Sequence, residues 1–398
     1  MEFIKILKNS KNEQNFNSES FMKQMNNGII ITGGIGDSIN IINDNYDEIK
    51  KISYIENLKE KPPLEEQKEI MKYKKTLNIS EKINNSDSKE IELIDFSKYG
   101  LLIYELNLET SEIILKRQNK KISCKECFEM NIKKGNNNVI EYIAMGEKVI
   151  LHLTQNFEEK INKKKKINTP YSGAIKISDK LIALISNEIL LSNGEDKLVF
   201  YDVEQKEIKQ TIKGFFTNSL YGISLVEIKE NETKGYKILI CACKNYNSNK
   251  KNGIFLVKPS IEEDDELSYK FEDTRKFEVN CICPIHSEDK GNTIFFFAGG
   301  LETERNLGWI KLYKFIYDHE SNSFDITFLQ DINIGETNIK DNEKELKGFE
   351  NSISCMLQNK KDKNILVGTS DGKVYVFSEP NLKYYIEEYE ERQLHLFN

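Results

Sequence analysis

The chain has 398 residues, of which 38% are apolar and 10% aromatic, enough to bury a large hydrophobic core. Charged residues make up 30% of the sequence but nearly balance, and the net charge of −7 argues against a protein that coats nucleic acid. No stretch approaches the roughly 18 apolar residues of a membrane span, and the charged start, MEFIKILKNSKNEQNF, is unlike a signal peptide. The odd number of cysteines, seven, is typical of reduced thiols, so we expect an intracellular, cytoplasmic protein.

Short apolar strands separated by turns recur along the whole chain. The first unit has strands predicted at 20–25, 28–34, 38–43 and 48–55, with Asp37 in its tight turn. The second has strands at 75–80, 91–96, 101–107 and 111–117. Between these two units, residues 61–75 begin with prolines followed by glutamates, a pattern that predicts a short inserted helix.

The middle of the chain repeats the pattern less regularly. The third unit has strands predicted at 124–132, 138–146 and 148–154, and the fourth at 180–185, 188–192, 197–203 and 207–213. The fifth has strands at 221–229, 237–244 and 253–259, and the sixth at 279–285, 293–300, 309–318 and 324–329. The lysine run 163–166 is interpreted as a solvated loop, with a nuclear localisation signal as the alternative.

The last unit, residues 346–378, shows the pattern most clearly. Ile353, Cys355 and Leu357 alternate with polar or small residues, as in a half-buried strand. Asp371-Gly372 lies between apolar runs and predicts a tight hairpin turn, because glycine supplies the positive φ that such turns require. The following strand is expected to bury Val376, and the unit is expected to finish with a further strand at 382–390.

This unit resembles one repeat of the WD-repeat (tryptophan–aspartate) β-propeller family. The family's Gly-His opening, turn Asp and Trp-Asp close correspond here to Gly348-Phe349, Asp371 and Phe377-Ser378. The fourth unit carries Asp196 at the turn and Tyr201-Asp202 at the close, and Gly214-Phe215 follows it. Because His and Trp are missing from these positions, the family's buried hydrogen-bond network is not expected, and strand packing must hold the blades.

The resemblance implies an all-β fold, a single seven-bladed β-propeller of four-stranded antiparallel blades with one short helical insertion. The implied single domain spans residues 1–398, with approximate blades at 20–55, 75–117, 122–167, 180–213, 221–273, 279–330 and 346–390. The family closes its ring by pairing one terminus with the blade at the other end. Two segments are candidates for that strand: residues 2–7, within the first eight, and residues 384–389.

No residue pattern indicates catalysis, a metal site or a bound cofactor. Cys124 and Cys127 form a CxxC without the second pair that zinc sites need, which favours small core residues. The glycines of 33–36 are followed by no helix, which favours a hairpin turn over a phosphate site. Two further sets of cysteines are spaced two residues apart and so point to one face of a predicted strand: Cys241 and Cys243, and Cys281 and Cys283. They are expected to pack in the core as free thiols.

Four residues are candidates for binding a partner, because aromatic residues and arginine are enriched at interface hot spots. These are Arg305, Trp309, Phe216 and Tyr221. The competing interpretation is that Trp309 starts a core strand, and that Phe215, Phe216, Tyr221 and Phe349 pack between blades.

The function that the resemblance implies is a non-catalytic protein–protein interaction scaffold, a WD-repeat-like subunit of a larger intracellular complex. Its expected partners are other proteins, with no nucleic acid, no membrane insertion and no cofactor. One alternative is an enzyme or ligand-binding propeller with a site in its central channel. Another is a substrate receptor of a ubiquitin ligase, which is disfavoured because no arginine follows Tyr201-Asp202 or Phe377-Ser378.

Overall fold

The chain forms two compact units in the computed structural model: unit 1 comprises Met1–Gln24 and Leu220–Asn398, and unit 2 comprises Met25–Ser219. The structure describes residues 1, 3–7, 19–25, 28–34, 38–43, 45–46, 49–53, 63–65, 76–80, 90–97, 100–107, 110, 112–119, 126–134, 137–145, 149–154, 159–166, 171–186, 196–216, 222–229, 235–243, 252–259, 267–285, 292–304, 306–332, 349 and 351–397. The expectation that the chain is a single domain stays a prediction.

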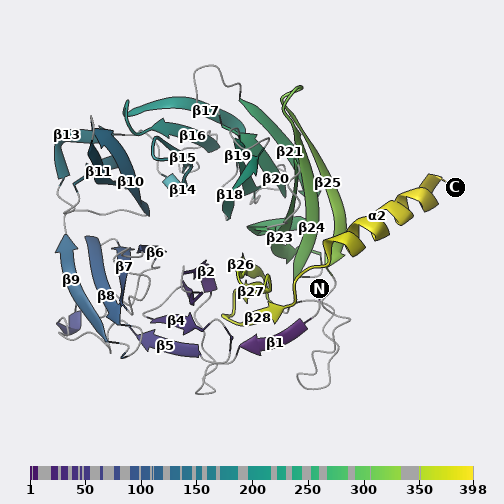
Figure 1. Cartoon of the computed structure of the whole chain (residues 1–398), viewed down its shortest axis with the longest axis horizontal. Coiled ribbons are helices and arrows are strands. Elements are labelled where there is room, and N and C mark those ends of the chain that lie inside the picture. The colour runs from purple at the N-terminus through teal and green to yellow at the C-terminus, as the bar shows by residue number, and fades with distance from the viewer. Residues whose placement is uncertain are drawn as a thin grey trace. The chain divides into compact units, whose positions relative to one another are not determined.

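The named strands form seven four-stranded antiparallel sheets (Figure 1). Unit 1 holds three of them. The first is β18 (Ile223–Lys229), β19 (Gly235–Cys243), β20 (Asn252–Lys258) and β21 (Ser268–Arg275). The second is β22 (Phe277–Ile285), β23 (Thr293–Glu302), β24 (Leu307–Asp318) and β25 (Ser323–Ile332). The third is β26 (Ile353–Gln358), β27 (Ile365–Thr369), β28 (Val374–Phe377) and β1 (Phe3–Leu7).

Unit 2 also holds three complete sheets. The first is β6 (Thr76–Ser80), β7 (Glu90–Ser97), β8 (Gly100–Asn107) and β9 (Ile113–Asn119). The second is β10 (Glu126–Lys134), β11 (Asn137–Met145), β12 (Val149–Leu153) and β13 (Glu159–Lys166). The third is β14 (Tyr171–Lys176), β15 (Leu181–Ser186), β16 (Asp196–Asp202) and β17 (Glu207–Phe216). The remaining sheet consists of β2 (Glu19–Gln24), β3 (Ile30–Gly34), β4 (Ser38–Ile42) and β5 (Ile49–Ser53).

The strands predicted for the first, second and sixth units coincide with these sheets to within a few residues. In the fourth unit, the last two predicted strands, 197–203 and 207–213, coincide with β16 and β17, but the first was assigned to the wrong strand. Its predicted first strand, 180–185, is the second strand β15, and the true first strand is β14. The sequence of β14, YSGAIK, has a glycine and a serine that weaken the strand signal. The predicted strand 188–192 lies outside the described residues.

Two further predictions concern loops and an insertion. The lysine run 163–166 ends strand β13, whose residues pair with β12, so the loop interpretation is wrong for the backbone. Of the predicted helix 61–75, only residues 63–65 are described, and Leu64 and Glu65 are helical. The turn residue Asp37 lies outside the described part of the chain.

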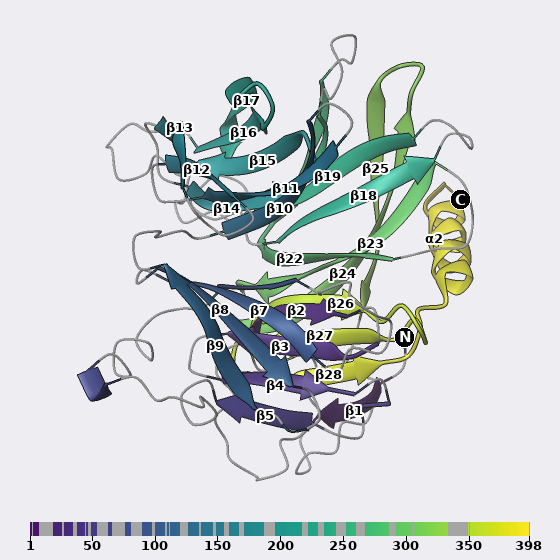
Figure 2. The same cartoon turned by 60° about the vertical axis from the view of Figure 1, so that its left-hand side comes forward.

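The N-terminal strand β1 completes the last sheet by pairing with β28, with Leu7 opposite Val374. This decides between the two candidate segments in favour of residues 2–7. Residues 382–390, predicted as a strand, instead begin helix α2 (Leu382–Phe397), which lies beside the β24–β25 hairpin (Figures 1 and 2). Among the described residues, no helix is long and apolar enough to cross a membrane.

Helix α2 forms because its apolar residues recur at helical spacing behind a capping residue. The Asn381 side-chain oxygen accepts a hydrogen bond from the Tyr384 backbone N–H at 3.2 Å, an N-cap interaction. Leu382, Ile386 and Tyr389 pack against the core together with buried Tyr385, the i, i+4, i+7 pattern of one helix face. The short alternation YYIEEY by itself predicts a strand. The N-cap at Asn381 and the helical spacing of the apolar residues favour a helix instead.

The hairpin that organises the last sheet has the predicted geometry. Gly372 has a φ of 84°, the left-handed conformation that glycine adopts without strain. The Thr369 hydroxyl donates a hydrogen bond to the Asp371 carboxylate at 2.5 Å, and the Gly372 N–H bonds to the Thr369 carbonyl at 2.9 Å. Asp371 therefore fixes the turn even though the other polar signature residues of the repeat are absent.

The sheet β22–β25 buries both of its faces in unit 1. One face contributes Phe295 and Phe297 to a cluster with residues of β26–β28, and the other contributes Phe296 and Phe315 to a cluster with residues of β18–β20. The first cluster also contains Phe349, whose backbone forms a two-hydrogen-bond bridge to Gly308 at 2.8 and 3.2 Å. A Cβ at Gly308 would collide with the Asn351 carbonyl oxygen, so the close approach requires glycine there.

Replacing Val376 with aspartate should unfold or strongly destabilise unit 1. Val376 is 0% exposed, and a buried, unpaired carboxylate costs several kcal/mol. Ser370→Asp adds the same charge at an exposed turn of the same hairpin and should leave the melting temperature nearly unchanged. Thermal melts of both variants followed by circular dichroism check this, and equal melting temperatures for the two would contradict the burial of Val376.

Candidate functional site

One row of side chains on β24 faces the sheet β18–β21. Trp309, Lys311 and Tyr313 alternate along the strand and therefore share one face. Trp309 and Tyr313 pack against the apolar cluster between the two sheets, and the Lys311 ammonium lies 5.1 Å from the centre of the Phe277 ring. Neighbouring strands add further polar groups, so this row is the strongest candidate site among the described residues.

Tyr313 lies at the centre of the row and is 3% exposed. Its ring stacks on Phe296 with centroids 5.4 Å apart and an interplanar angle of 12°, and it contacts Phe328 of β25 at 5.4 Å. Burial raises the pKa of the Tyr313 phenol, and the carboxylates of Glu272 and Asp331 raise it further. The hydroxyl is thus within electrostatic range of both carboxylates, and it is not among the buried polar atoms of the described residues that lack a hydrogen-bond partner, so solvent can satisfy it.

Lys311 is already engaged by its neighbours. Its ammonium lies 3.1 Å from a carboxylate oxygen of Asp331 and 5.3 Å from the centre of the Phe328 ring. The register across β24 and β25 places Lys311 directly opposite Asp331, which is why this ion pair forms. The ion pair therefore lies close to the Phe328 ring.

Glu272 comes from the facing sheet. It lies on the edge strand β21 opposite Ile254, a residue of the same apolar cluster, and β21 lies against β25. Partial burial raises the pKa of the Glu272 carboxyl, Lys270 lowers it, and Asp273 raises it. The described residues provide no ion pair or hydrogen bond to this carboxylate. We refer to Glu272, Lys311, Tyr313, Phe328 and Asp331 as the Tyr313 cluster.

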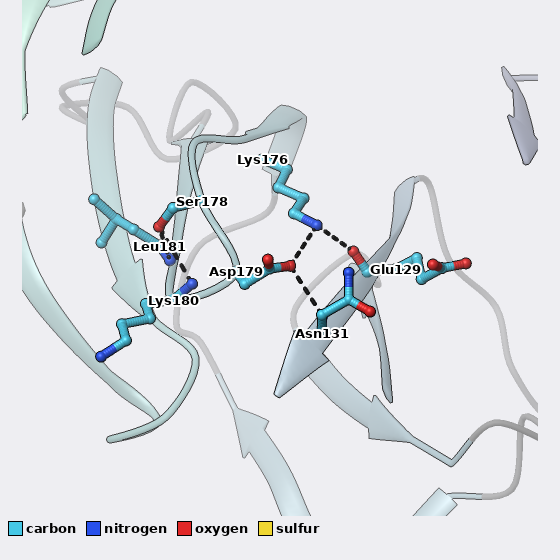
Figure 3. Close-up of polar contacts among 7 residues, drawn as sticks. All are labelled: Glu129, Asn131, Lys176, Ser178, Asp179, Lys180 and Leu181. Atoms are coloured by element: carbon cyan, nitrogen blue, oxygen red, sulfur yellow. Dashed lines mark hydrogen bonds and ion pairs between the residues drawn. The ribbon is translucent and has the colours of Figure 1, made fainter. Parts of the chain in front are cut away.

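A second polar group, in unit 2, is fully paired and acts as a structural link (Figure 3). The Lys176 ammonium lies 2.7 Å from the Asp179 carboxylate and donates to the Glu129 carbonyl oxygen at 2.6 Å. The same carboxylate accepts the Asn131 backbone N–H at 2.9 Å. The Ser178 hydroxyl oxygen accepts two N–H groups at 3.2 Å and shapes the turn between β14 and β15. The bonds of Lys176 and Asp179 join this turn to β10. Because these polar groups already have partners, they offer little further hydrogen-bonding capacity to a ligand.

A buried hydrogen bond also joins two sheets of unit 2. His152 on β12 and Tyr201 on β16 are almost completely buried, and the His152 Nε2 lies 3.0 Å from the Tyr201 hydroxyl. Burial raises the pKa of Tyr201, with a further contribution from Asp202. The sequence placed Tyr201 at the family's tryptophan position but assigned His152 no role. A buried polar pair therefore exists here although the family's own network was not expected.

The predicted partner-binding residues fall in different places. Trp309 lies on β24 and is partly buried against the core, as the alternative interpretation stated. Arg305 and Tyr221 lie outside the described residues. Phe216 ends strand β17, and its side chain is outside the description. Their role in binding a partner stays a prediction.

The Tyr313 cluster was missed at the sequence level. A signal existed in WIKLYKF, where an aromatic residue, a lysine and a tyrosine alternate with apolar residues along one strand. That pattern indicates a face with polar groups. It cannot reveal Asp331 or Glu272, because Asp331 depends on the pairing of β24 with β25 and Glu272 on the packing of a second sheet.

The cysteines of the described part of the chain are buried. Cys241, Cys243, Cys281, Cys283 and Cys355 are all buried free thiols. Cys124 lies outside the described residues, as does the side chain of Cys127. In the portion of the chain that the structure describes, no group of three or more His, Cys, Asp or Glu side chains is arranged to hold a metal ion.

Comparison with known proteins identifies the fold. No protein-family model matches the chain, and no curated protein matches it in sequence. A chain of the "Crystal Structure of Mitotic Checkpoint Complex" aligns with a TM-score of 0.52 and 8% identity, over 93% of this chain and 92% of that one. At this identity the likeness shows the fold alone, a β-propeller whose blades are the seven four-stranded antiparallel sheets. The closer resemblance to the WD-repeat family stays a prediction.

The buried thiols should be chemically inert in the folded protein. Burial raises the pKa of Cys241 and of Cys283 to about 12, so at pH 8 the reactive thiolate fraction is about 10⁻⁴. Alkylation with iodoacetamide, read by peptide mass spectrometry, should modify both residues only after denaturant is added. Rapid modification of either in the native protein would contradict its burial.

Removing the Tyr313 hydroxyl should cost almost no stability. Tyr313→Phe keeps the stacked ring and deletes a hydroxyl without a described partner, so the change in unfolding free energy should stay within about 1 kcal/mol. Tyr201→Phe is the matched control because its hydroxyl is paired with His152, and it should cost about 1–3 kcal/mol. Urea unfolding of both variants checks this. Equal losses in the two variants would show that the Tyr313 hydroxyl has a structural partner.

Proposed function

We propose that this protein is a non-catalytic interaction scaffold, a WD-repeat-like subunit of a larger cytoplasmic complex. The Tyr313 cluster is the observation that supports the proposal. It combines a partly exposed aromatic ring, that of Phe328, with the partly exposed charged side chains of Glu272 and Lys311. Interfaces are enriched in such aromatic anchors.

The fold comparison supports the same proposal at a coarser level. The matched chain is part of a complex, the mitotic checkpoint complex. A propeller scaffold presents loops and sheet edges on a rigid frame, and binding surfaces are commonly built from such segments. Fold alone does not determine function, so the proposal depends on the specific surface.

The proposal predicts that one surface substitution separates binding from folding. Phe328 is 38% exposed and Ile316, in the same sheet, is 37% exposed. Phe328→Asp places a charge in the Tyr313 cluster and should abolish recovery of a stoichiometric partner. Ile316→Asp is the matched control at similar exposure and should retain that partner. Affinity purification from the native cell with quantitative mass spectrometry measures the recovery for each variant.

Three results have distinct meanings. A partner lost only with Phe328→Asp supports the scaffold and the surface. A partner retained by both variants supports the scaffold and contradicts the choice of surface. A protein that is recovered alone and converts small molecules would contradict the scaffold itself.

A further inference from the structure

Helix α2 is held against the sheet β22–β25 by a small set of side-chain contacts. Tyr385 is 6% exposed and belongs to the same apolar cluster as Leu329 of β25. Leu382, Ile386 and Tyr389 pack against that cluster but are only partly buried. Because a helix makes its backbone hydrogen bonds within itself, side chains must hold α2 beside the β24–β25 hairpin (Figures 1 and 2).

One arginine supplies the polar anchor of this contact. The Arg392 guanidinium donates to the Leu329 carbonyl oxygen at 3.1 Å and to the Glu388 carbonyl oxygen of its own helix at 3.3 Å. Leu329 is the extra residue of a β-bulge at the register shift between β24 and β25, so its carbonyl is open to a donor from outside the sheet. Arg392 itself is exposed, and water therefore competes for both bonds.

The same contact buries two oxygen atoms that have no hydrogen-bond partner among the described residues. They are Oε1 of Gln330 on β25 and Oε2 of Glu388 on α2. Gln330 lies opposite Leu312, a member of the apolar cluster under α2, so it shares the face that the helix covers. Glu388 lies three residues after Tyr385 and four before Arg392, on the helix face that contacts the sheet. Burying an oxygen that gains no donor weakens the contact.

The helix that covers this face shows what chemistry fits it. We refer to Leu312, Lys314, Leu329 and Gln330 as the α2 docking face. An occupant needs apolar side chains at helical spacing, ending in an aromatic ring such as that of Tyr389, whose centre lies 5.6 Å from the Lys314 ammonium. It also needs an arginine less than one turn further on, to reach the bulge carbonyl. A helix with this pattern but without a carboxylate at the position of Glu388 would bury one unpaired oxygen fewer than α2 does.

We propose that α2 is a displaceable strap, and that the α2 docking face binds an amphipathic helix of a partner protein when the strap lifts. In the closed form α2 occupies the face and blocks it. In the open form a partner helix with the same apolar spacing and an arginine takes its place. This inference rests on the proposed function for the identity of the occupant as a partner protein, and it adds a surface whose access the chain itself controls.

The α2 sequence itself provides the probe. A fluorescein-labelled peptide of residues 380–398 keeps the Asn381 cap, the apolar residues and Arg392, and fluorescence anisotropy measures its binding to the full-length protein. The control peptide carries Ile386→Asp, which places a charge on the apolar face and should abolish binding. The resident helix competes with the peptide, so the apparent affinity depends on the fraction of molecules in which α2 has lifted.

Two substitutions in the resident helix should change this affinity in opposite directions. Arg392→Ala removes the polar anchor, so the peptide should bind about tenfold more tightly. Glu388→Met removes the carboxylate whose buried oxygen lacks a partner, so the peptide should bind about fivefold more weakly. Glu391→Met is the matched control at an exposed position of the same helix and should bind like wild type. Amide hydrogen exchange of α2, read by mass spectrometry, should be faster in the first variant and slower in the second.

Three results overturn the proposal. They are the absence of saturable peptide binding to the Arg392→Ala protein, equal effects of Glu388→Met and Glu391→Met, and dimers of the Arg392→Ala protein in size-exclusion chromatography. Dimers would place α2 of a second copy, rather than a partner helix, on the docking face. Circular dichroism verifies that each variant is folded, and Glu388→Met provides the test if Arg392→Ala misfolds.

The scaffold function is tested separately from the strap. If the α2 variants bind the peptide like wild type while Phe328→Asp still loses the cellular partner, the scaffold function stands and only the strap fails.

Discussion

Face-to-face packing of neighbouring sheets is the constraint on which the structure of unit 1 depends. The sheet β22–β25 is apolar on both faces, with Phe295 and Phe297 on one and Phe296 and Phe315 on the other. A sheet of this kind is stable only between two neighbours, because leaving either face in water forfeits about 25 cal/mol for each Å² of apolar surface. The polar row of Trp309, Lys311 and Tyr313 lies within one of these interfaces. Its geometry is therefore set by the packing that holds the fold together.

Much of the fold was predictable because period-2 alternation and tight-turn residues are local signals. The hairpin at Asp371-Gly372 needs only its own residues, and it has the predicted conformation. The failures occurred where local signals compete. Strand β14 contains Gly173 and gives a weak signal, so the stronger run that forms β15 was assigned the first position. Residues 382–390 combine strand-forming aromatics with a helical spacing, and the Asn381 cap favours the helix.

Long-range pairing accounts for most of what sequence reasoning could not decide. The choice between the two terminal segments depends on which one reaches the free edge of β28, and β1 occupies that edge. The same limit applies to the candidate site. Trp309 was identified from its residue type, but Asp331 comes from the neighbouring strand β25 and Glu272 from the facing sheet, so neither follows from the sequence of β24. The residue pattern of one strand shows which side chains share a face of the sheet. A binding site is built from side chains of several strands, and their pairing is not visible in that pattern.

Hydrogen-bond satisfaction distinguishes structural polar groups from candidate binding groups better than burial does. Tyr201 and Tyr313 are both almost completely buried, and burial raises the pKa of both phenols. The Tyr201 hydroxyl, however, lies 3.0 Å from His152, so its polar demand is met inside the fold. The Tyr313 hydroxyl, by contrast, is not among the buried side-chain oxygens that lack a hydrogen-bond partner in the described part of the chain, which include those of Gln210 and Gln330. Burial and a raised phenol pKa therefore do not by themselves mark Tyr313 as a binding group, and hydrogen-bond satisfaction has to be judged for each polar atom.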